Sequence, residues 1–194
     1  MKRILFSPIG TTDPISNCAD GPLLHICRVY RPDLVYLYLS KEICEIQNKD
    51  DRYRYSLSRL SKATGHDLEI TSIERNELTD VHEFDYFYNE FKNILKEIHE
   101  KFPEAEILLN VSSGTPAMQC TLYSLAVLGE FAGLSAIQVS TPEKKHNPRR
   151  DRLEDYDKEL YWETNEDNSD NFTNRCKILE EKNALARFTE KTIQ

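Results

Sequence analysis

Five short apolar segments, separated by helix-like stretches, constrain the fold of this chain more than any other feature of its sequence. Several are apolar at nearly every position, which is typical of strands buried on both faces of a parallel sheet. The segments are residues 3–7, 33–39, 66–73, 106–111 and 134–139. We therefore expect an α/β architecture in which helices cover both faces of a sheet.

The stretches between these segments have the patterns of helices. Residues 81–102 repeat Phe84, Phe87 and Phe91 at spacings of three and four, which predicts an amphipathic helix. Further helices are expected at residues 22–29, 41–60 and 115–131. Alternating strands and helices predict a Rossmann-like, doubly wound, mainly parallel sheet. Right-handed crossovers place the loops after the strands along one edge, where ligands bind in such folds.

The sequence changes in character after Val139. Leu160-Tyr161-Trp162 is predicted to be a last edge strand that pairs with the segment around Val139 and completes a C-terminal edge hairpin. Residues 166–171 predict a linker, and the apolar spacing from Phe172 predicts a helix that is unfinished at Gln194. We expect the native chain to continue beyond this helix. The expected division is a domain over residues 1–165 and a linker with an incomplete helix over 166–194.

Composition and charge exclude several classes of protein. The 194 residues carry a net charge of −8, which argues against broad duplex DNA or RNA binding but leaves a small anionic ligand open. Five scattered cysteines without a Cys-x-x-Cys pair predict neither disulfides nor a zinc site, and favour a cytoplasmic protein. Pro8 cuts short the only apolar run near the start, and no stretch is long enough to span a bilayer, so we expect neither a signal peptide nor a membrane partner. We expect no cofactor and no metal.

Two loops that directly follow strands each combine a glycine, hydroxyl side chains and a proline near a helix start. The first contains Gly10, Thr11 and Thr12, and the second runs from Asn110 to Met118. Free amides at a helix start favour a phosphate, and the first and fourth strands flank the switch point of a Rossmann sheet. Each loop alone is a weak signal, and an ordinary turn explains the first at least as well, but together they predict one binding crevice. Neither matches the glycine-rich dinucleotide motif or the P-loop, which argues against NAD binding and ATP hydrolysis.

Four short motifs, in this order along the chain, resemble the CARF domain, the CRISPR-associated Rossmann fold of the type III-A CRISPR ancillary CARF–HEPN ribonucleases. Besides the two loops, they are Asp20-Gly21-Pro22-Leu23-Leu24-His25-Ile26 and Tyr30-Arg31-Pro32-Asp33-Leu34-Val35-Tyr36-Leu37. In that family the domain dimerises, binds a cyclic oligoadenylate across the two-fold axis and activates a C-terminal HEPN ribonuclease domain. Some members also cleave the ring slowly through attack by a ribose 2′-hydroxyl. The resemblance therefore implies a homodimeric sensor of this second messenger in antiviral defence, with cyclic hexa-adenylate favoured over cyclic tetra-adenylate.

The resemblance also implies which residues contact the ring. Gly10, Thr11 and Thr12 would contact ribose or phosphate, and the second loop would form the floor of the pocket. The implied ligand-binding residues of the second loop are Asn110, Ser112, Ser113, Gly114, Thr115 and Met118. Ring cleavage needs no metal, because the pocket need only align the 2′-oxygen with its own phosphorus and stabilise the developing charge. Thr115 is the first candidate for this catalytic role, and Thr11 or Thr12 the second.

The sequence departs from the family in its ribonuclease motif, an Arg and a His separated by four to six residues. Pairs with that spacing occur at Arg59 and His66 and at Arg75 and His82, but both lie within the α/β region and we attribute them to chance. We expect the ribonuclease domain to lie outside this chain. His25, on the first predicted helix, is expected to serve in packing or at the dimer interface.

Two other functions are compatible with the sequence. A small α/β hydrolase or transferase acting on a mononucleotide would use Ser112 or Ser113 as its nucleophile, but the sequence places no His or acid to activate either hydroxyl. A plain dimerisation module would bind no ligand at all, and replacing Gly114 and Thr115 would then leave its function intact.

Overall fold

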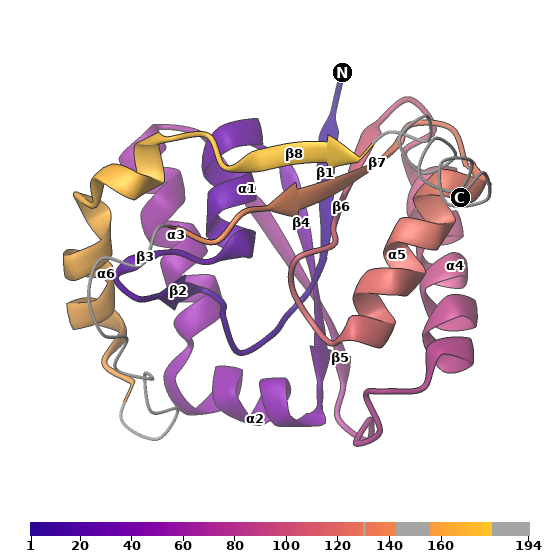
Figure 1. Ribbon diagram of the computed structural model, residues 1–194, viewed down its shortest axis with the longest axis horizontal. Helices are drawn as coiled ribbons and strands as arrows, with labels where there is room; N and C mark the ends of the chain where they lie inside the picture. The colour runs from indigo at the N-terminus through magenta and orange to yellow at the C-terminus, as the bar shows by residue number, and fades with distance from the viewer. Residues whose placement is uncertain (130, 143–155, 180–194) are drawn as a thin grey trace, which may run out of the picture.

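The computed structural model describes residues 1–129, 131–142 and 156–179. In that part of the chain, six strands form one sheet in the order β5-β4-β1-β6-β7-β8 (Figure 1). Five of them are parallel to their neighbours, and β8 pairs with β7 in the antiparallel direction. The strands are β1 (Arg3–Pro8), β4 (Leu34–Ser40), β5 (Glu69–Arg75), β6 (Glu106–Asn110), β7 (Leu134–Val139) and β8 (Cys176–Leu179). The predicted Rossmann-like, mainly parallel sheet is confirmed.

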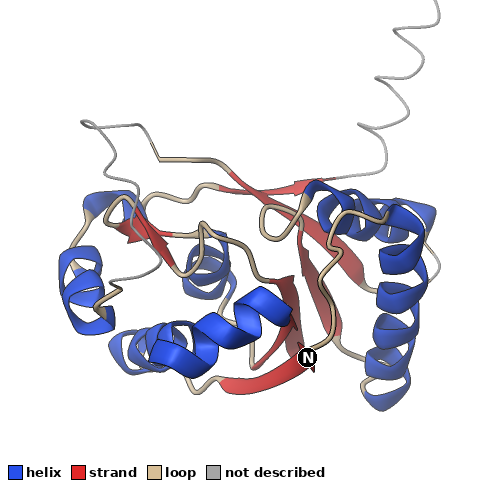
Figure 2. Ribbon diagram, turned by 90° about the horizontal axis from the view of Figure 1, so that it is seen from below, coloured by secondary structure: helices blue, strands red, loops and turns tan. Residues whose placement is uncertain are grey.

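Helices cover both faces of this sheet, as Figure 2 shows. The helices are α1 (Pro22–Tyr30), α2 (Lys41–Asp50), α3 (Arg52–Thr64), α4 (Phe84–Lys101), α5 (Pro116–Leu128) and α6 (Lys158–Glu166). Residues of α1, α2, α3 and α6 belong to the core on one face, whereas those of α4 and α5 belong to the core on the other. The helices therefore change face between β1 and β6, which is where the order of the strands reverses.

The near-continuous apolar strands arise because both faces of the sheet are covered. In β1, Leu5 packs into the core with α1 and α3, while Ile4 and Phe6 pack into the core with α4 and α5. All three side chains are completely buried. Each contributes roughly 1.5–3 kcal/mol relative to an exposed position, so a polar residue at any of them is strongly disfavoured.

The prediction of an edge strand at Leu160-Tyr161-Trp162 is wrong, because this segment lies within α6. The Asp157 carboxylate accepts hydrogen bonds from the backbone amides of Glu159 and Leu160, both at 3.1 Å, and thereby caps the helix. Trp162 is 1% exposed and packs into the core beside α1 and α3. Packing of this helix against the domain, rather than strand pairing, buries the apolar residues.

The antiparallel partner of β7 is instead β8, which aligns Val139 with Cys176. A 3₁₀ turn, η2 (Ser169–Phe172), precedes it. The linker predicted over 166–171 and the helix predicted from Phe172 are therefore wrong as far as the structure describes them, and the sheet includes residues beyond 165. The remainder of that predicted helix, residues 180–194, lies outside the described residues.

Two local features were missed in the sequence. The single helix predicted over 41–60 is divided into α2 and α3 at Asp51, whose φ of 58° ends the first helix in the left-handed conformation. A small hairpin formed by β2 (Ile15–Ser16) and β3 (Ala19–Asp20) follows the first loop. Over the described ranges, no helix has the length and apolar character needed to cross a membrane.

Candidate ligand-binding site

Two loops leave the carboxyl edge of the sheet where the strand order reverses. The first loop (residues 9–14) follows β1, and the second loop (residues 111–115) follows β6, which pairs directly with β1. They lead toward α1 and α5, which lie on opposite faces of the sheet. This is the switch point at which open α/β sheets bind ligands.

The backbones of the two loops touch at two glycines. A Cβ atom on Gly10 would lie 2.8 Å from the amide nitrogen of Gly114. Gly114 itself has a φ of +79°, and a Cβ there would lie 2.8 Å from Sδ of Met118. Neither position has room for a side chain, so both glycines allow the close approach. The two loops therefore lie side by side, and the binding crevice expected between them stays a prediction.

Asn110 and Met118 support the second loop from beneath. Asn110 is completely buried, and its Nδ2 donates to the hydroxyls of Ser7 and Ser113, each at 2.9 Å. Its Oδ1 accepts from the amide of Ser112 at 3.0 Å. Met118 is 2% exposed and packs under Gly114. In this arrangement, both residues shape the loop, and their direct contact with a ligand stays a prediction.

The hydroxyl groups of the second loop are engaged within the protein. Ser112 Oγ accepts from the amide of Val139 at 2.8 Å, and Ser113 is 1% exposed. Thr115 Oγ1 donates to the carbonyl of Val81 at 2.6 Å and accepts from the Met118 amide at 3.4 Å, which caps α5. The burial of Ser113 counts against its use as a nucleophile, because a substrate does not reach it.

The part of the predicted site that faces solvent lies mainly on the first loop. Thr11 and Thr12 are exposed, whereas Gly10, Gly114 and Thr115 are half-buried. The amide of Asp13 donates to the carbonyl of Gly10 at 3.2 Å and closes the turn that carries the two threonines. The exposed part of this region therefore includes two threonines, Thr11 and Thr12.

Asp13 is the residue of this region that the sequence analysis missed. Its side chain is 4% exposed, and its carboxylate accepts from the amides of Leu23 (2.9 Å) and Gly10 (3.5 Å) and from the hydroxyl of Ser113. Burial outweighs these three hydrogen bonds and raises the pKa of Asp13 to about 6. The position of Asp13 in the turn after Gly10 could have indicated that it belongs to the site. Its burial could not be foreseen, because it follows from contacts with distant segments of the chain.

A second buried polar cluster lies at α1 and β3, centred on Asp20. The carboxylate of Asp20 accepts from Arg28 Nε at 2.6 Å and Asn165 Nδ2 at 2.8 Å. Arg175, just before β8, donates its amide to Nε2 of His25 at 3.0 Å. Burial and the neighbouring Arg175 lower the pKa of His25 to about 4. His25 is completely buried, as expected for a packing residue.

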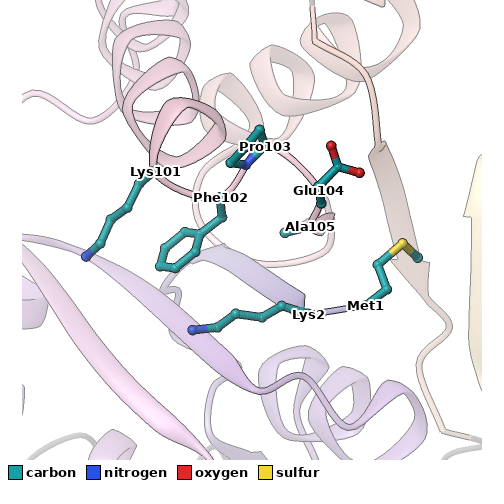
Figure 3. A pocket seen from close by; sticks show the side chains of 7 residues that line it. All are labelled: Met1, Lys2, Lys101, Phe102, Pro103, Glu104 and Ala105. Carbon is teal, nitrogen blue, oxygen red and sulfur yellow. The ribbon is translucent and has the colours of Figure 1, made fainter.

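A pocket also lies at the opposite edge of the sheet. It adjoins the amino ends of β1 and β6, and Figure 3 shows Lys2, Lys101 and Phe102 within it. The ammonium group of Lys2 lies 4.4 Å from the centre of the Phe102 ring. The residues that line it are Met1, Lys2, Lys101, Phe102, Pro103, Glu104 and Ala105. None of the predicted site residues is among them.

The fold and the paired loops together define a Rossmann-like α/β domain with two contacting loops at its switch point. The family model described as the Cas_Csm6 CARF domain matches residues 67–176 of the chain. The chain therefore belongs to the CARF-domain family of Csm6 proteins, and the resemblance seen in its sequence is confirmed.

Two named proteins with similar sequences support the assignment to the Csm6 family. A protein of Mycobacterium tuberculosis named CRISPR system endoribonuclease Csm6 is 46% identical over 175 residues, which are 89% of this chain and 41% of that protein. A protein of the same name from Enterococcus italicus is 37% identical over 148 residues, covering 76% of this chain and 34% of that protein. The chain thus spans well under half the length of these two relatives.

A solved structure of Enterococcus italicus Csm6 bound to cyclic hexa-2′-fluoro-hexa-dAMP matches the whole of this chain and 45% of that one. The TM-score is 0.72 and the sequence identity is 30%. This match agrees with the fold of the described residues.

Proposed function

We propose that this chain is a sensor domain that binds cyclic oligoadenylate in CRISPR antiviral defence. The observation that carries the proposal is the backbone contact between the two loops at the switch point, where Gly10 meets Gly114. The family assignment supports it, because a related structure holds a cyclic hexa-adenylate analogue. The whole-protein activity of the longer relatives is part of the same proposal.

The chemistry of the loops suits a ring of phosphodiesters. Thr11 and Thr12 offer exposed hydroxyls, and the amides at the start of α5 carry the favourable end of the helix dipole. We assign ribose and phosphate contacts to the first loop and to the exposed parts of Ser112, Gly114 and Thr115. Asn110, Ser113 and Met118 would act by holding these groups in place.

A two-fold symmetric ring fits a two-fold symmetric pair of domains, each contributing both loops. We therefore propose a homodimer that binds one ring. Cyclic hexa-adenylate is favoured over the tetra-adenylate, since the analogue in the related Enterococcus italicus structure has six nucleotides.

We further propose that ring binding controls a HEPN ribonuclease domain that follows this domain in the longer protein. The relatives named endoribonuclease are more than twice as long as the segment they share with this chain. The sensor domain would comprise residues 1–165 together with β8, and the residues after it would lead to the ribonuclease. Arg and His residues have the spacing of the ribonuclease motif at two places in this chain. In one of them, Arg75 forms an ion pair with Glu90 at 2.6 Å, as expected of a structural residue rather than a catalytic one.

Slow ring cleavage is a second proposed activity. The ribose 2′-oxygen would attack its own phosphorus, the bond to the 5′-oxygen would break, and the products would be a 2′,3′-cyclic phosphate and a 5′-hydroxyl. The 2′-proton leaves and a proton reaches the 5′-oxygen, so no metal or co-reactant is required. Thr115 retains an acceptor lone pair that can orient the 2′-hydroxyl, and Thr11 or Thr12 can approach the phosphate.

Native mass spectrometry with each ring size tests these proposals. We expect a dimer that holds one cyclic hexa-adenylate, and linear fragments after hours if the ring is cleaved. A dimer that binds neither ring would contradict the sensor function and favour a plain dimerisation module. An intact ring after prolonged incubation would refute cleavage alone.

A further inference from the structure

Asp13 joins three segments of the chain at the candidate site. Its carboxylate accepts from the amide of Gly10 in the first loop and from the amide of Leu23 in the first turn of α1. It also accepts from the hydroxyl of Ser113 in the second loop, whose oxygen in turn accepts from Asn110. No other carboxylate bonds to both loops in the part of the chain that the structure describes.

These bonds fix the relation between the two loops. Gly10 lies in backbone contact with Gly114, so a shift of the first loop would open or close the surface that faces the ligand. The side chain of Asp13 is 4% exposed, and therefore acts from behind the loop rather than on the ligand itself. The Asp13 carboxylate would also lie close to any phosphate that binds at Gly10 or at the start of α5.

We propose that Asp13 is a positioning residue that locks the first loop onto the second and takes up a proton when an anionic ring binds. This inference rests on the proposed function. A bound phosphodiester disfavours the nearby carboxylate through like-charge repulsion, and protonation removes the repulsion. A protonated Asp13 still offers its carbonyl oxygen to the amide of Leu23, so the first loop stays anchored to the first turn of α1.

The surroundings of Asp13 favour such a change of charge. Burial already raises the pKa of Asp13 to about 6, near the pH at which binding would be measured. The ionisable groups that face it are Tyr53 of α3 and Cys27 of α1. Burial raises the pKa of each, so both stay uncharged between pH 6 and 8. Phosphodiesters keep their charge over the same range.

Isothermal titration with cyclic hexa-adenylate at pH 6, 7 and 8 tests the proposal. If the ring raises the pKa of Asp13 by about one unit, affinity falls about fivefold from pH 6 to pH 8. Under the same assumption, titrations in buffers of different ionisation enthalpy should show uptake of about half a proton at pH 6.5. Asp13→Asn should abolish both effects and, under the same assumption, bind the ring up to about tenfold more tightly than the wild type at pH 8, because its amide carries no charge that repels the ring.

The matched control is Glu106→Gln, which removes a carboxylate that pairs with Arg3 at the opposite edge of the sheet. This variant should retain the pH dependence and the proton uptake of the wild type. Absence of proton uptake by a wild-type protein that binds the ring would overturn the proposal, even if Asp13→Asn fails to fold. An unchanged pH dependence in a folded Asp13→Asn variant would also overturn it. Failure of the wild type to bind either ring at any pH would instead refute the proposed function.

Discussion

Asp13 and His25 are two buried ionisable residues whose pKa values are displaced in opposite directions. Burial raises the pKa of Asp13 to about 6, so its contribution to stability is full below pH 4 and is lost as pH rises through 6. Burial lowers the pKa of His25 to about 4, so its contribution is full above pH 6.5 and is lost as pH falls through 4. Between about pH 4 and pH 6, Asp13 is protonated mainly in the folded state and His25 mainly in the unfolded state. The two effects therefore nearly cancel in the wild type.

Single substitutions should expose the two opposing effects. Asp13→Asn should cost more stability at pH 4.5 than at pH 7, because the amide removes a buried charge that is present only at the higher pH. His25→Gln should cost more at pH 7 than at pH 4.5. Each difference should reach at most about 3 kcal/mol, the value of a two-unit shift. Urea unfolding at the two pH values measures this, and parallel profiles for the two variants would contradict it.

At the scale of elements, the start of α5 illustrates how one residue serves helix and loop together. Thr115 caps α5 through the amide of Met118 and ties the helix start to the segment before α4 through the carbonyl of Val81. Because α4 and α5 share one core, this tie sets the position of the second loop relative to both helices.

Thr115→Val and Thr115→Ser should separate the roles of the methyl and hydroxyl groups. The valine variant should lose about 1 kcal/mol of stability through the missing cap, and should lose ring cleavage if Thr115 orients the 2′-hydroxyl. The serine variant should retain both. Thermal unfolding and a time course of ring cleavage provide the two readouts. Cleavage by the valine variant at the wild-type rate would exclude Thr115 from the catalytic step.

The cluster around Asp20 holds the C-terminal elements to the rest of the fold. Asp20 accepts from Asn165 of α6, and its amide donates to Asn171 of η2 at 2.7 Å. Arg175 donates to the carbonyl of Asp20 at 2.8 Å, immediately before β8. The cluster therefore holds in place the segment that leads from α6 into β8.

Removing the central carboxylate should loosen that connection. Asp20→Ala leaves Arg28 without its buried partner and should cost about 3–5 kcal/mol. Amide hydrogen exchange should rise in α6 and β8 before it rises in β4. Glu100→Ala, which breaks an exposed pair with Lys96, serves as the control and should change stability by less than about 0.5 kcal/mol. Equal costs for the two substitutions would contradict a structural role for the Asp20 cluster.

At the scale of the whole molecule, the parallel sheet was predictable because its strands are buried on both faces. Leu34–Ser40 is the clearest case, because all seven of its residues are buried, and its bounds differ by one residue at each end from the predicted 33–39. The apolar triplet at residues 160–162 lacked such a signature, being too short to distinguish strand from helix. Its helical state depends on the Asp157 cap and on packing of Trp162 against distant elements.

The candidate site was predictable to a similar extent. Glycines and hydroxyls at the ends of two strands located the loops, and the sheet topology brought them together. The burial of Asp13 was not predictable, because it depends on Ser113, one hundred residues further along the chain. Nor did the sequence reveal that Asn110 and Met118 lie beneath the loop, since the loop's own path decides that.

The proposed binding site is tested most directly by an NMR titration of the ¹⁵N-labelled chain with cyclic hexa-adenylate. We predict that the amide signals of Gly10, Thr11, Thr12 and residues 112–115 shift, while those of residues 101–105, at the opposite pocket, do not. Saturation should occur at one ring per two chains. Shifts confined to residues 101–105, or no shifts at all, would contradict the claim that the two loops form the binding site.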